Sequence, residues 1–467
     1  MVGGLAAALL PAVKKAGAVW FGSSGNTRHI KAGASPLVQV EAYGRGAIAT
    51  VDLPEQHYTG FYEGYANSAL WPLLHSRADL SRGSPRDYQA YCAVNAYMAR
   101  ALTAFGGANS TFWIHDYHFL PLARELRKLG VSAKIGFFLH TPWPNPHVIA
   151  LLPQCRELIE AMLAYDLIGF QTDEHRDNFA DILRDLRIPR TGLTFTSVYG
   201  TCRLATFPIG IDTQEFADNA QEACNDEGVR RLCASTVGMR LIIGVDRLDY
   251  SKGLLQRAKA FDSLLTRYPG FKRHLSLLQI AVPSRSTIDI YRHLQCELAG
   301  LVGEINGKHG EIDWTPIRYL NKGFAQSTLA GFYRAASIGL VTPLQDGMNL
   351  VAKEYVAAQD PANPGVLVLS KFAGAARELD GALLVDPHDI EAVSRQIAVA
   401  LAMPKDQRRA RWQHMMDGLL HRSIHAWFSN FTHELKSAER KNIFTLAPTE
   451  IPMLPSSVSK ATVVAGP

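Results

Sequence analysis

The chain has 467 residues, of which 47% are apolar and 19% are charged. This length exceeds what one hydrophobic core normally serves, so we expect two domains of about 200 residues each. The 48 basic and 43 acidic residues give a net charge of +5, which suits small anionic substrates and excludes the concentrated basic face of a nucleic-acid-binding protein.

Neither a membrane span nor a disulfide framework is expected. No run of about 18 apolar residues occurs. The apolar opening stretch, residues 1–17, carries Lys14 and Lys15 after its apolar run instead of before it, unlike a secretory signal peptide. Six scattered cysteines without a CxxC pair are typical of reduced thiols in a cytoplasmic protein, not of a structural zinc site.

Short apolar runs rich in β-branched and aromatic residues alternate with longer helical stretches. Such runs, ending in polar or Gly/Pro residues, are typical of parallel strands buried on both faces. The pattern predicts an α/β protein with two doubly wound domains. The runs are AIATVDL (47–53), TFWIHD (111–116), KIGFFLH (134–140), LIGFQT (167–172), LATFPIG (204–210), LIIGVD (241–246), SLLQIAV (276–282), IGLVTP (338–343), GVLVLS (365–370) and ALLVDP (382–387).

The domain boundary is expected between Gly210 and Leu241, where the sequence turns polar before a new strand. We predict an N-terminal domain and a C-terminal domain, then a helix that packs back, then a disordered tail with several prolines. These four parts correspond to residues 1–235, 236–420, 421–440 and 441–467.

The segment VDRLDYSKG (245–253) places two cations after a predicted strand. Arg247 and Lys252 could hold a pyrophosphate from two directions and neutralise the charge of a leaving group. The alternative is a surface ion pair with Asp246 or Asp249, and the spacing alone does not decide between the two.

The segment TPLQDGMNLVAKEY (342–355) combines a strand end, a glycine turn and a helix start near Asn349. Backbone N–H groups at a helix start bind anions. Asp346 and Glu354 could reach different hydroxyls of one ligand. The alternatives are a helix-capping role for Asp346 and a plain surface charge for Glu354.

Histidines follow two predicted strands of the first half. WIHDYH (113–118) could in principle hold a metal, but no third and fourth ligands stand at a suitable spacing. A hydrogen-bonding cluster for a polar substrate is the preferred interpretation. His140, before a proline-rich loop, is either a satisfied core histidine or a site residue.

Together these segments resemble the trehalose-6-phosphate synthase family, retaining glycosyltransferase family 20. The resemblance extends from about Gly3 to the region of Leu435. It implies a GT-B fold with two Rossmann-like domains, a UDP-glucose donor, a glucose 6-phosphate acceptor and no metal cofactor. The motifs that carry it are WIHDYHFLPLARELR (113–127), IGFFLH (135–140), YDLIGFQT (165–172), FPIGID (207–212), VDRLDYSKG (245–253), EINGKHG (304–310) and DGMNLVAKEYVAAQDPANPGVLVLSKFAGAA (346–376).

The resemblance also implies roles for individual residues. The family's front-face mechanism, in which the leaving phosphate takes the acceptor proton, implies catalytic roles for Asp346, Arg247, Lys252 and His140. The implied UDP-glucose contacts are Gly3, Gly4, Arg247, Lys252, Phe324, Leu350, Val351, Ala352, Lys353 and Glu354. The implied acceptor contacts are Tyr62, Trp71, Asp116 and Arg285.

The chain departs from the family pattern in three places. Met1 stands two residues before Gly3, so the family's first strand and its phosphate-binding arginine are missing. Because that strand is normally central, its loss should leave neighbouring strand edges unpaired; a misassigned start or a truncated gene is the preferred explanation. Ser23 replaces a usual tryptophan and Gln345 a usual arginine.

Two alternatives to this activity stay open. One is a sister enzyme with another acceptor or donor, such as a glucosylglycerol-phosphate synthase. The other is a catalytically impaired paralogue that binds UDP-glucose. The resemblance further implies soluble small-molecule substrates, a homo-oligomer, a separate phosphatase acting downstream and a role in osmotic stress.

Overall fold

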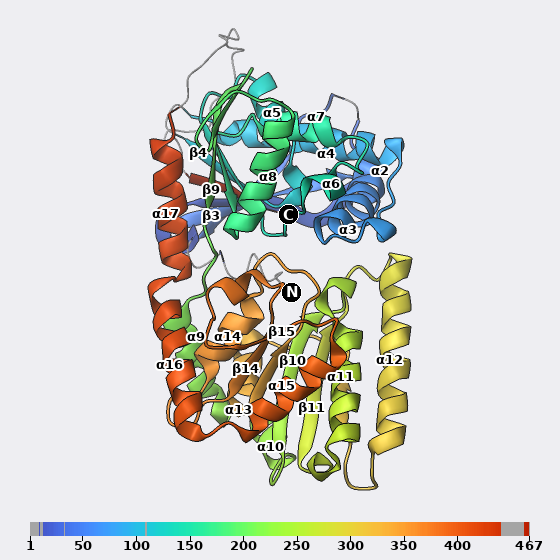
Figure 1. The fold of residues 1–467 in the computed structure, drawn as a ribbon. Helices are drawn as coiled ribbons and strands as arrows, with labels where there is room; N and C mark the ends of the chain where they lie inside the picture. Colours follow the sequence, from blue (N-terminus) through green and yellow to red (C-terminus); the bar gives the residue numbers. More distant parts are fainter. Residues whose placement is uncertain (1–8, 10–12, 32, 108–109, 440–461, 467) are drawn as a thin grey trace. The chain divides into compact units, whose positions relative to one another are not determined.

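The computed structural model describes residues 9, 13–31, 33–107, 110–439 and 462–466. These residues form two compact units (Figure 1). The first comprises Met1–Pro208 and Trp427–Pro467, and the second comprises Ile209–Ala426. Each is an α/β unit built on one sheet, as the apolar runs predicted.

The first unit contains a ten-stranded sheet in the order β2-β3-β1-β16-β4-β5-β6-β9-β8-β7. Its strands are β1 (Val19–Arg28), β2 (Val38–Tyr43), β3 (Gly46–Pro54), β4 (Thr111–His115), β5 (Lys134–Phe138), β6 (Leu167–Phe170), β7 (Arg190–Thr191), β8 (Thr194–Ser197), β9 (Gly200–Thr206) and β16 (Thr462–Ala465). The helices include α2 (Glu55–Tyr58), the π-helix η1 (Thr59–Leu70), α3 (Trp71–Leu74), α4 (Pro85–Leu102), α5 (Leu122–Lys128), α6 (Pro146–Ile149), α7 (Cys155–Met162), α8 (Asp173–Asp185) and α17 (Ile424–Ser437).

The second unit contains a six-stranded parallel sheet in the order β12-β11-β10-β13-β14-β15. Its strands are β10 (Arg240–Arg247), β11 (Leu275–Val282), β12 (Ile317–Leu320), β13 (Ile338–Val341), β14 (Val366–Ser370) and β15 (Leu383–Val385). Its helices are α9 (Thr213–Glu222), α10 (Glu227–Ala234), α11 (Leu254–Arg267), α12 (Asp289–His309), α13 (Gln326–Ala335), α14 (Leu350–Ala358), α15 (Ile390–Ala402) and α16 (Lys405–His421). The strand order is that of the Rossmann fold, with the reversal between β10 and β13.

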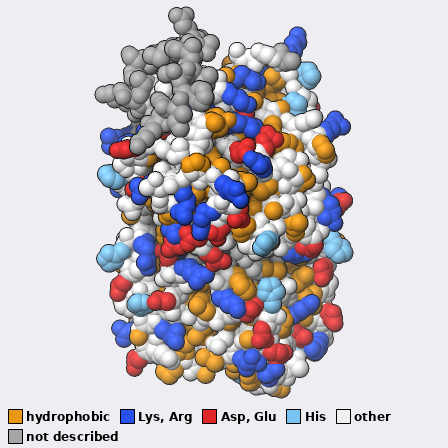
Figure 2. Space-filling view, turned by 45° about the horizontal axis from the view of Figure 1, so that its top comes forward, with side chains coloured by type: hydrophobic (Ala, Val, Ile, Leu, Met, Phe, Trp, Pro, Cys, Tyr) orange, Lys and Arg blue, Asp and Glu red, His pale blue; other side chains and the backbone are white. Residues whose placement is uncertain are grey.

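The apolar runs form strands because both faces of each sheet are covered. All five residues of β14 are buried, as are seven of the eight residues of β11. In the second unit α11 packs with α12 and α15, whereas α9 packs with α13 and α14. On the molecular face shown in Figure 2, basic and acidic side chains are intermixed, in keeping with the small net charge.

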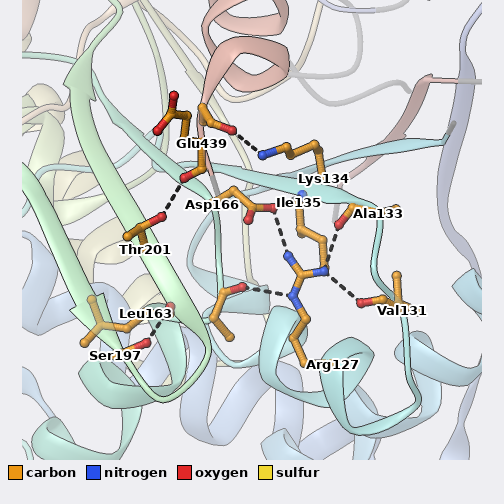
Figure 3. A network of polar contacts seen from close by, with 12 residues as sticks. Arg127, Val131, Ala133, Lys134, Ile135, Leu163, Asp166, Ser197, Thr201 and Glu439 are labelled. Atoms are coloured by element: carbon orange, nitrogen blue, oxygen red, sulfur yellow. Dashed lines mark hydrogen bonds and ion pairs between the residues drawn. The ribbon is translucent and has the colours of Figure 1, made fainter. Parts of the chain in front are cut away.

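A buried ion pair ties α5 to the first sheet (Figure 3). The Arg127 guanidinium donates to Asp166 Oδ2 at 2.8 Å and to the carbonyls of Val131 and Ala133 at 2.8 and 2.7 Å. The same Asp166 oxygen accepts from the backbone N–H of Ile135 at 2.7 Å. Because every bond of this network connects different segments, the pair fixes where β5 and β6 begin.

The boundary between the two units lies between Pro208 and Ile209, whereas the sequence had predicted it between residues 235 and 236. The polar segment after residue 208 belongs to the second unit because α9 packs there, with the Phe216 ring 6.3 Å from that of Tyr333. The helix α17 packs on the first unit, where Phe431 stacks on Trp113 at 4.1 Å. The expected helix over 421–440 is therefore α17 together with the end of α16.

The prediction of a disordered tail over 441–467 is wrong for its last part. Residues 440–461 lie outside the described residues, but Thr462–Ala465 form strand β16 in the middle of the first sheet. β16 pairs in parallel with β1 and with β4. The edges expected to be unpaired for want of a first strand are therefore paired.

Candidate active site

The second sheet has its topological switch point between β10 and β13, whose carboxyl ends lie side by side. Ligands of open α/β sheets bind at this position. Arg247 is the exposed last residue of β10, and Asp346 follows β13. The structure thus places these two predicted site residues at the same edge of one sheet.

Lys252 and Asp346 are in direct contact. Lys252 Nζ lies 2.5 Å from Asp346 Oδ2, and the two side chains are 12% and 13% exposed. The loops are close enough for this contact because Gly253 adopts φ +63°, where a Cβ would stand 2.1 Å from the Thr342 carbonyl oxygen. The result is a cation beside a carboxylate at the switch point.

The two carboxylates that the spacing of VDRLDYSKG offered to Lys252 as ion-pair partners have other close contacts. Asp246 instead forms a buried ion pair with Arg257 at 2.7 Å. Asp249 accepts from Arg285 at 3.1 Å. The carboxylate that Lys252 contacts at 2.5 Å is that of Asp346.

Asp346 is not the cap of the following helix. Asn349 is the N-cap of α14, and its Oδ1 accepts from the N–H of Ala352 at 3.1 Å. Asn349 also donates from Nδ2 to Asp346 Oδ2 at 3.0 Å, which orients the carboxylate. The predicted helix start near Asn349 is confirmed. Sequence reasoning had not assigned the side-chain amide of Asn349 to the site.

The first turns of α14 carry the five residues expected along the nucleotide sugar. Leu350, Val351 and Glu354 are partly exposed, whereas Ala352 and Lys353 are buried. Lys353 Nζ donates to the Ile209 carbonyl at 2.6 Å and to Glu378 at 2.5 Å. The ammonium group of Lys353 therefore has a structural role, and only its backbone could serve a ligand.

Glu354 lies in the middle of α14, and Phe324 lies two residues before α13. Burial raises the pKa of the Glu354 carboxyl to about 7, an effect that Gln326 and Tyr333 partly offset. Gln326 Nε2 donates to Glu354 Oε1 at 3.4 Å. The Phe324 ring contacts Phe332 edge-on at 5.3 Å and has Lys322 Nζ at 5.2 Å from its centroid.

Arg285, one of the expected acceptor contacts, belongs to the second unit. Its guanidinium donates to Asp249 Oδ2 at 3.1 Å and to Tyr291 Oη at 2.7 Å. Its backbone has φ +50°, a left-handed conformation that is uncommon for a non-glycine residue. Two further predicted or adjacent site residues share this feature, Asp116 at φ +72° and Asn349 at φ +79°, as is typical of functional sites.

In the first unit, Asp116 and His140 follow the adjacent strands β4 and β5. Asp116 Oδ1 accepts from the backbone N–H of His140 at 3.3 Å. His140 Nε2 lies 3.0 Å from His115 Nδ1. Burial lowers the pKa of both imidazoles, that of His140 to about 3. The two rings are therefore neutral at physiological pH, and one donates its N–H to the other.

Tyr62 and Trp71 lie in an aromatic cluster next to these strand ends. The Tyr62 ring stacks on Tyr58 at 5.6 Å and on His118 at 5.8 Å. Trp71 is buried, with its ring 5.4 Å from that of Tyr117. Stacked rings of this kind form a rigid wall against which the apolar face of a sugar can pack.

The structure says little about the other positions singled out in the sequence. Gly3 and Gly4 lie outside the described residues. Ser23 is on β1, where its Oγ accepts from the N–H of Gly25 at 3.1 Å. Gln345 directly precedes Asp346 in the loop after β13.

Within the described ranges, no three or more His, Cys, Asp or Glu side chains are grouped so that they could hold a metal ion. Of the helices that the structure describes, none has the length and apolar character needed to cross a membrane.

The comparisons with known proteins identify the family. The sequence pattern of Glycosyltransferase family 20 matches residues 2–437. The trehalose-6-phosphate synthase of Sinorhizobium fredii is 43% identical over 439 residues, which are 93% of this chain and 94% of that protein. That of Salmonella choleraesuis is 42% identical over 436 residues, 93% of this chain and 91% of that protein.

Solved structures match as well. A UDP-forming trehalose-phosphate synthase from Burkholderia xenovorans in complex with glucose-6-phosphate has a TM-score of 0.90 at 43% identity, covering 93% of this chain and 96% of that one. The E. coli protein bound with UDP-2-fluoro glucose has a TM-score of 0.88 at 40% identity, covering 94% and 97%. The fold and the resemblance predicted from the sequence are both confirmed, and the chain belongs to glycosyltransferase family 20, the trehalose-6-phosphate synthases.

Proposed function

We infer that the chain transfers glucose from UDP-glucose to glucose 6-phosphate, giving trehalose 6-phosphate and UDP. The observation that carries this inference is the contact of Lys252 with Asp346 at the switch point of the second sheet. It places a cation suited to a diphosphate beside a carboxylate suited to sugar hydroxyls. Relatives bound with glucose-6-phosphate and with UDP-2-fluoro glucose support the choice of both substrates.

The bonds that break and form in this reaction imply a role for each of these residues. The bond between C1 of the donor glucose and the diphosphate oxygen breaks, and C1 bonds to O1 of glucose 6-phosphate on the same face. The O1 proton passes to the leaving phosphate oxygen. Arg247 and Lys252 would neutralise the charge that develops on UDP. Because these two cations are already in the protein, we propose that the transfer needs no metal ion.

The ion pair of Lys252 with Asp346 suggests how donor binding would orient the Asp346 carboxylate. Lys252 would exchange Asp346 for the diphosphate when the donor binds, which would free a lone pair of Asp346 Oδ2 for the glucose hydroxyls. Asn349 keeps that carboxylate oriented during the exchange. The pair thus holds both groups close to their working positions before substrate arrives.

We propose the other contacts by position. Leu350 and Val351 would offer backbone groups to the nucleotide sugar, Glu354 would accept from the ribose and Phe324 would lie at the uracil. Tyr62, Trp71, Asp116 and Arg285 would bind glucose 6-phosphate, with His140 beside the donor sugar.

The test is UDP release from UDP-glucose with and without glucose 6-phosphate, followed by NMR of the product. Release that requires both substrates, with an α,α-linked product, is the expected result. Binding of UDP-glucose without turnover, even across a panel of phosphorylated acceptors, would overturn the proposal and favour an impaired paralogue. Turnover with an acceptor other than glucose 6-phosphate would favour a sister enzyme.

Three further proposals concern the fate of the product, the oligomeric state and the location of the protein in the cell. The product is a phosphate monoester, so a phosphatase on a separate chain would have to convert it to trehalose. A homo-oligomer is proposed and is tested by light scattering on the purified protein. A cytoplasmic location is proposed because both substrates are phosphorylated intracellular metabolites, and fractionation of the source cells tests it.

A further inference from the structure

Five residues near the end of the sequence occupy the centre of the first sheet. The strand β16 pairs in parallel with β1, with Val463 opposite Val19 and Val464 opposite Trp20. On its other side it pairs with β4, again in parallel. Gly466 extends the pairing by donating its N–H to the carbonyl of Phe21 at 3.1 Å.

The segment is buried as completely as any core strand. Val463, Val464 and Ala465 have no exposed surface. Successive side chains of a strand point to opposite faces, so this short segment contributes to the core on both sides of the sheet. On one of these sides Trp113, which lies opposite Val464, stacks on Phe431 of α17.

The slot is shaped for small residues at its far end. A Cβ on Gly466 would stand 2.8 Å from the Trp20 ring. A Cβ on Gly22 would stand 3.2 Å from the Gly466 carbonyl oxygen. The fit therefore favours a glycine at position 466.

β16 also connects the part of the sheet that ends with β1 to the part that begins with β4. In the strand order β1 and β4 are neighbours of β16 and not of each other. Asp116 directly follows the last residue of β4, His115. The His115 ring in turn contacts that of His140. Without β16, the N–H and C=O groups on the inner edges of β1 and β4 would lose their partners.

We propose that residues 462–466 act as a donor strand that completes the first sheet from within the same chain. The slot between β1 and β4 is the strand-acceptor site, and an extended, apolar peptide of this sequence type is its ligand. Main-chain hydrogen bonds would supply affinity and the side-chain pockets specificity, as in other cases of strand addition. The proposal depends on strand pairing and burial and is independent of the glucosyl transfer.

The first test is hydrogen exchange on the intact chain. Amides of Val463–Gly466 should be protected as strongly as those of Val19–Phe21 in the neighbouring strand. Exchange at the rate of an unfolded peptide would overturn the proposal. Protection that disappears on dilution would overturn the assignment to the same chain in favour of exchange between copies.

The second test compares two matched substitutions. Val464→Asp places a carboxylate in the buried strand and should lower the melting temperature by about 10 °C or more. Val237→Asp makes the same change at a residue that is 80% exposed and should leave the melting temperature unchanged. Equal melting temperatures for the two variants would contradict the donor-strand role.

The third test separates the slot from its occupant. A chain that ends at residue 459 should lose stability, and a synthetic peptide of residues 460–467 should restore it when added in trans. The same peptide carrying Val464→Asp should not. A shortened chain as stable as the intact one, or equal rescue by both peptides, would refute the proposal. If the shortened chain is recovered only as aggregate, co-refolding with each peptide gives the same comparison.

Discussion

Lys252→Gln is the substitution that most directly tests the chemistry assigned to the switch point. It removes the cation 2.5 Å from Asp346 and keeps a side chain of similar length. Losing one preorganised group that stabilises transition-state charge typically costs a factor of about 10²–10³ in kcat, or about 3–4 kcal/mol. The pair is mostly buried but hydrogen-bonded to Asn349 as well, so we expect the fold to survive.

The assay is UDP release at saturating concentrations of both substrates, with the melting temperature measured in parallel. Lys308→Gln is the matched control, since Lys308 Nζ contacts Asp262 at 2.9 Å in the same unit but away from the switch point. The control should retain full kcat. Donor affinity should weaken in Lys252→Gln because the diphosphate loses a ligand.

The reasoning is refuted if Lys252→Gln keeps its kcat within about threefold of the unmodified chain, given the factor expected above. It is equally refuted if the two lysine variants lose the same activity. A fall in kcat that tracks a large fall in melting temperature would point to a structural role for Lys252, and thermal unfolding of the two variants distinguishes these outcomes.

The remaining predictions concern stability and metal dependence. Arg127→Met should lower the free energy of unfolding by about 3–5 kcal/mol because it leaves Asp166 buried without its cation, whereas Arg156→Met, in an exposed helical pair, should change it little; urea titration measures both. Lys353→Met should destabilise the second unit by a smaller amount, since Glu378 loses Lys353 but keeps its ion pair with Arg422 at 3.0 Å; a urea midpoint equal to that of the unmodified chain would contradict this. Excess EDTA should leave UDP release unchanged, and a loss restored by Mg²⁺ would contradict the metal-free proposal.

Much of the fold and part of the site could be predicted because both depend on local sequence. Continuous apolar runs mark buried parallel strands, and the residues that end them meet at one edge of the sheet. Arg247, Asp346, Asp116 and His140 were placed at strand ends by this reasoning alone. The direct contact of Lys252 with Asp346 spans 94 positions in the sequence, and no local pattern indicates such a pairing.

Other features were missed for the same physical reason. Strand β16 has only four residues and follows a proline-containing stretch, so its composition resembled a disordered tail. Its stability comes from β1 and β4, partners that are more than 340 positions away in the chain. The domain boundary was misplaced because the polar sequence of α9 gives no sign of which sheet its buried Phe216 packs against.

One carboxyl of the candidate site, that of Glu354, has a pKa near neutral pH. Burial lowers the pKa of His140 to about 3, so this imidazole stays neutral between pH 5 and 8 and contributes no slope there. Burial raises the pKa of Glu354 to about 7, so this carboxyl is protonated below that pH and ionised above it. An ionised carboxylate accepts hydrogen bonds from ribose hydroxyls better than a protonated one.

UDP-glucose should therefore bind more weakly as the pH falls from 8 to 6. In the free protein the sign is opposite: a raised pKa means that folding favours the protonated form, so this group lowers stability as the pH rises toward 7. Glu354→Gln should abolish the pH dependence of binding and leave a weaker, constant affinity, measurable by calorimetry. Persistence of the transition near pH 7 in Glu354→Gln would assign it to another group and remove Glu354 from the ribose contact.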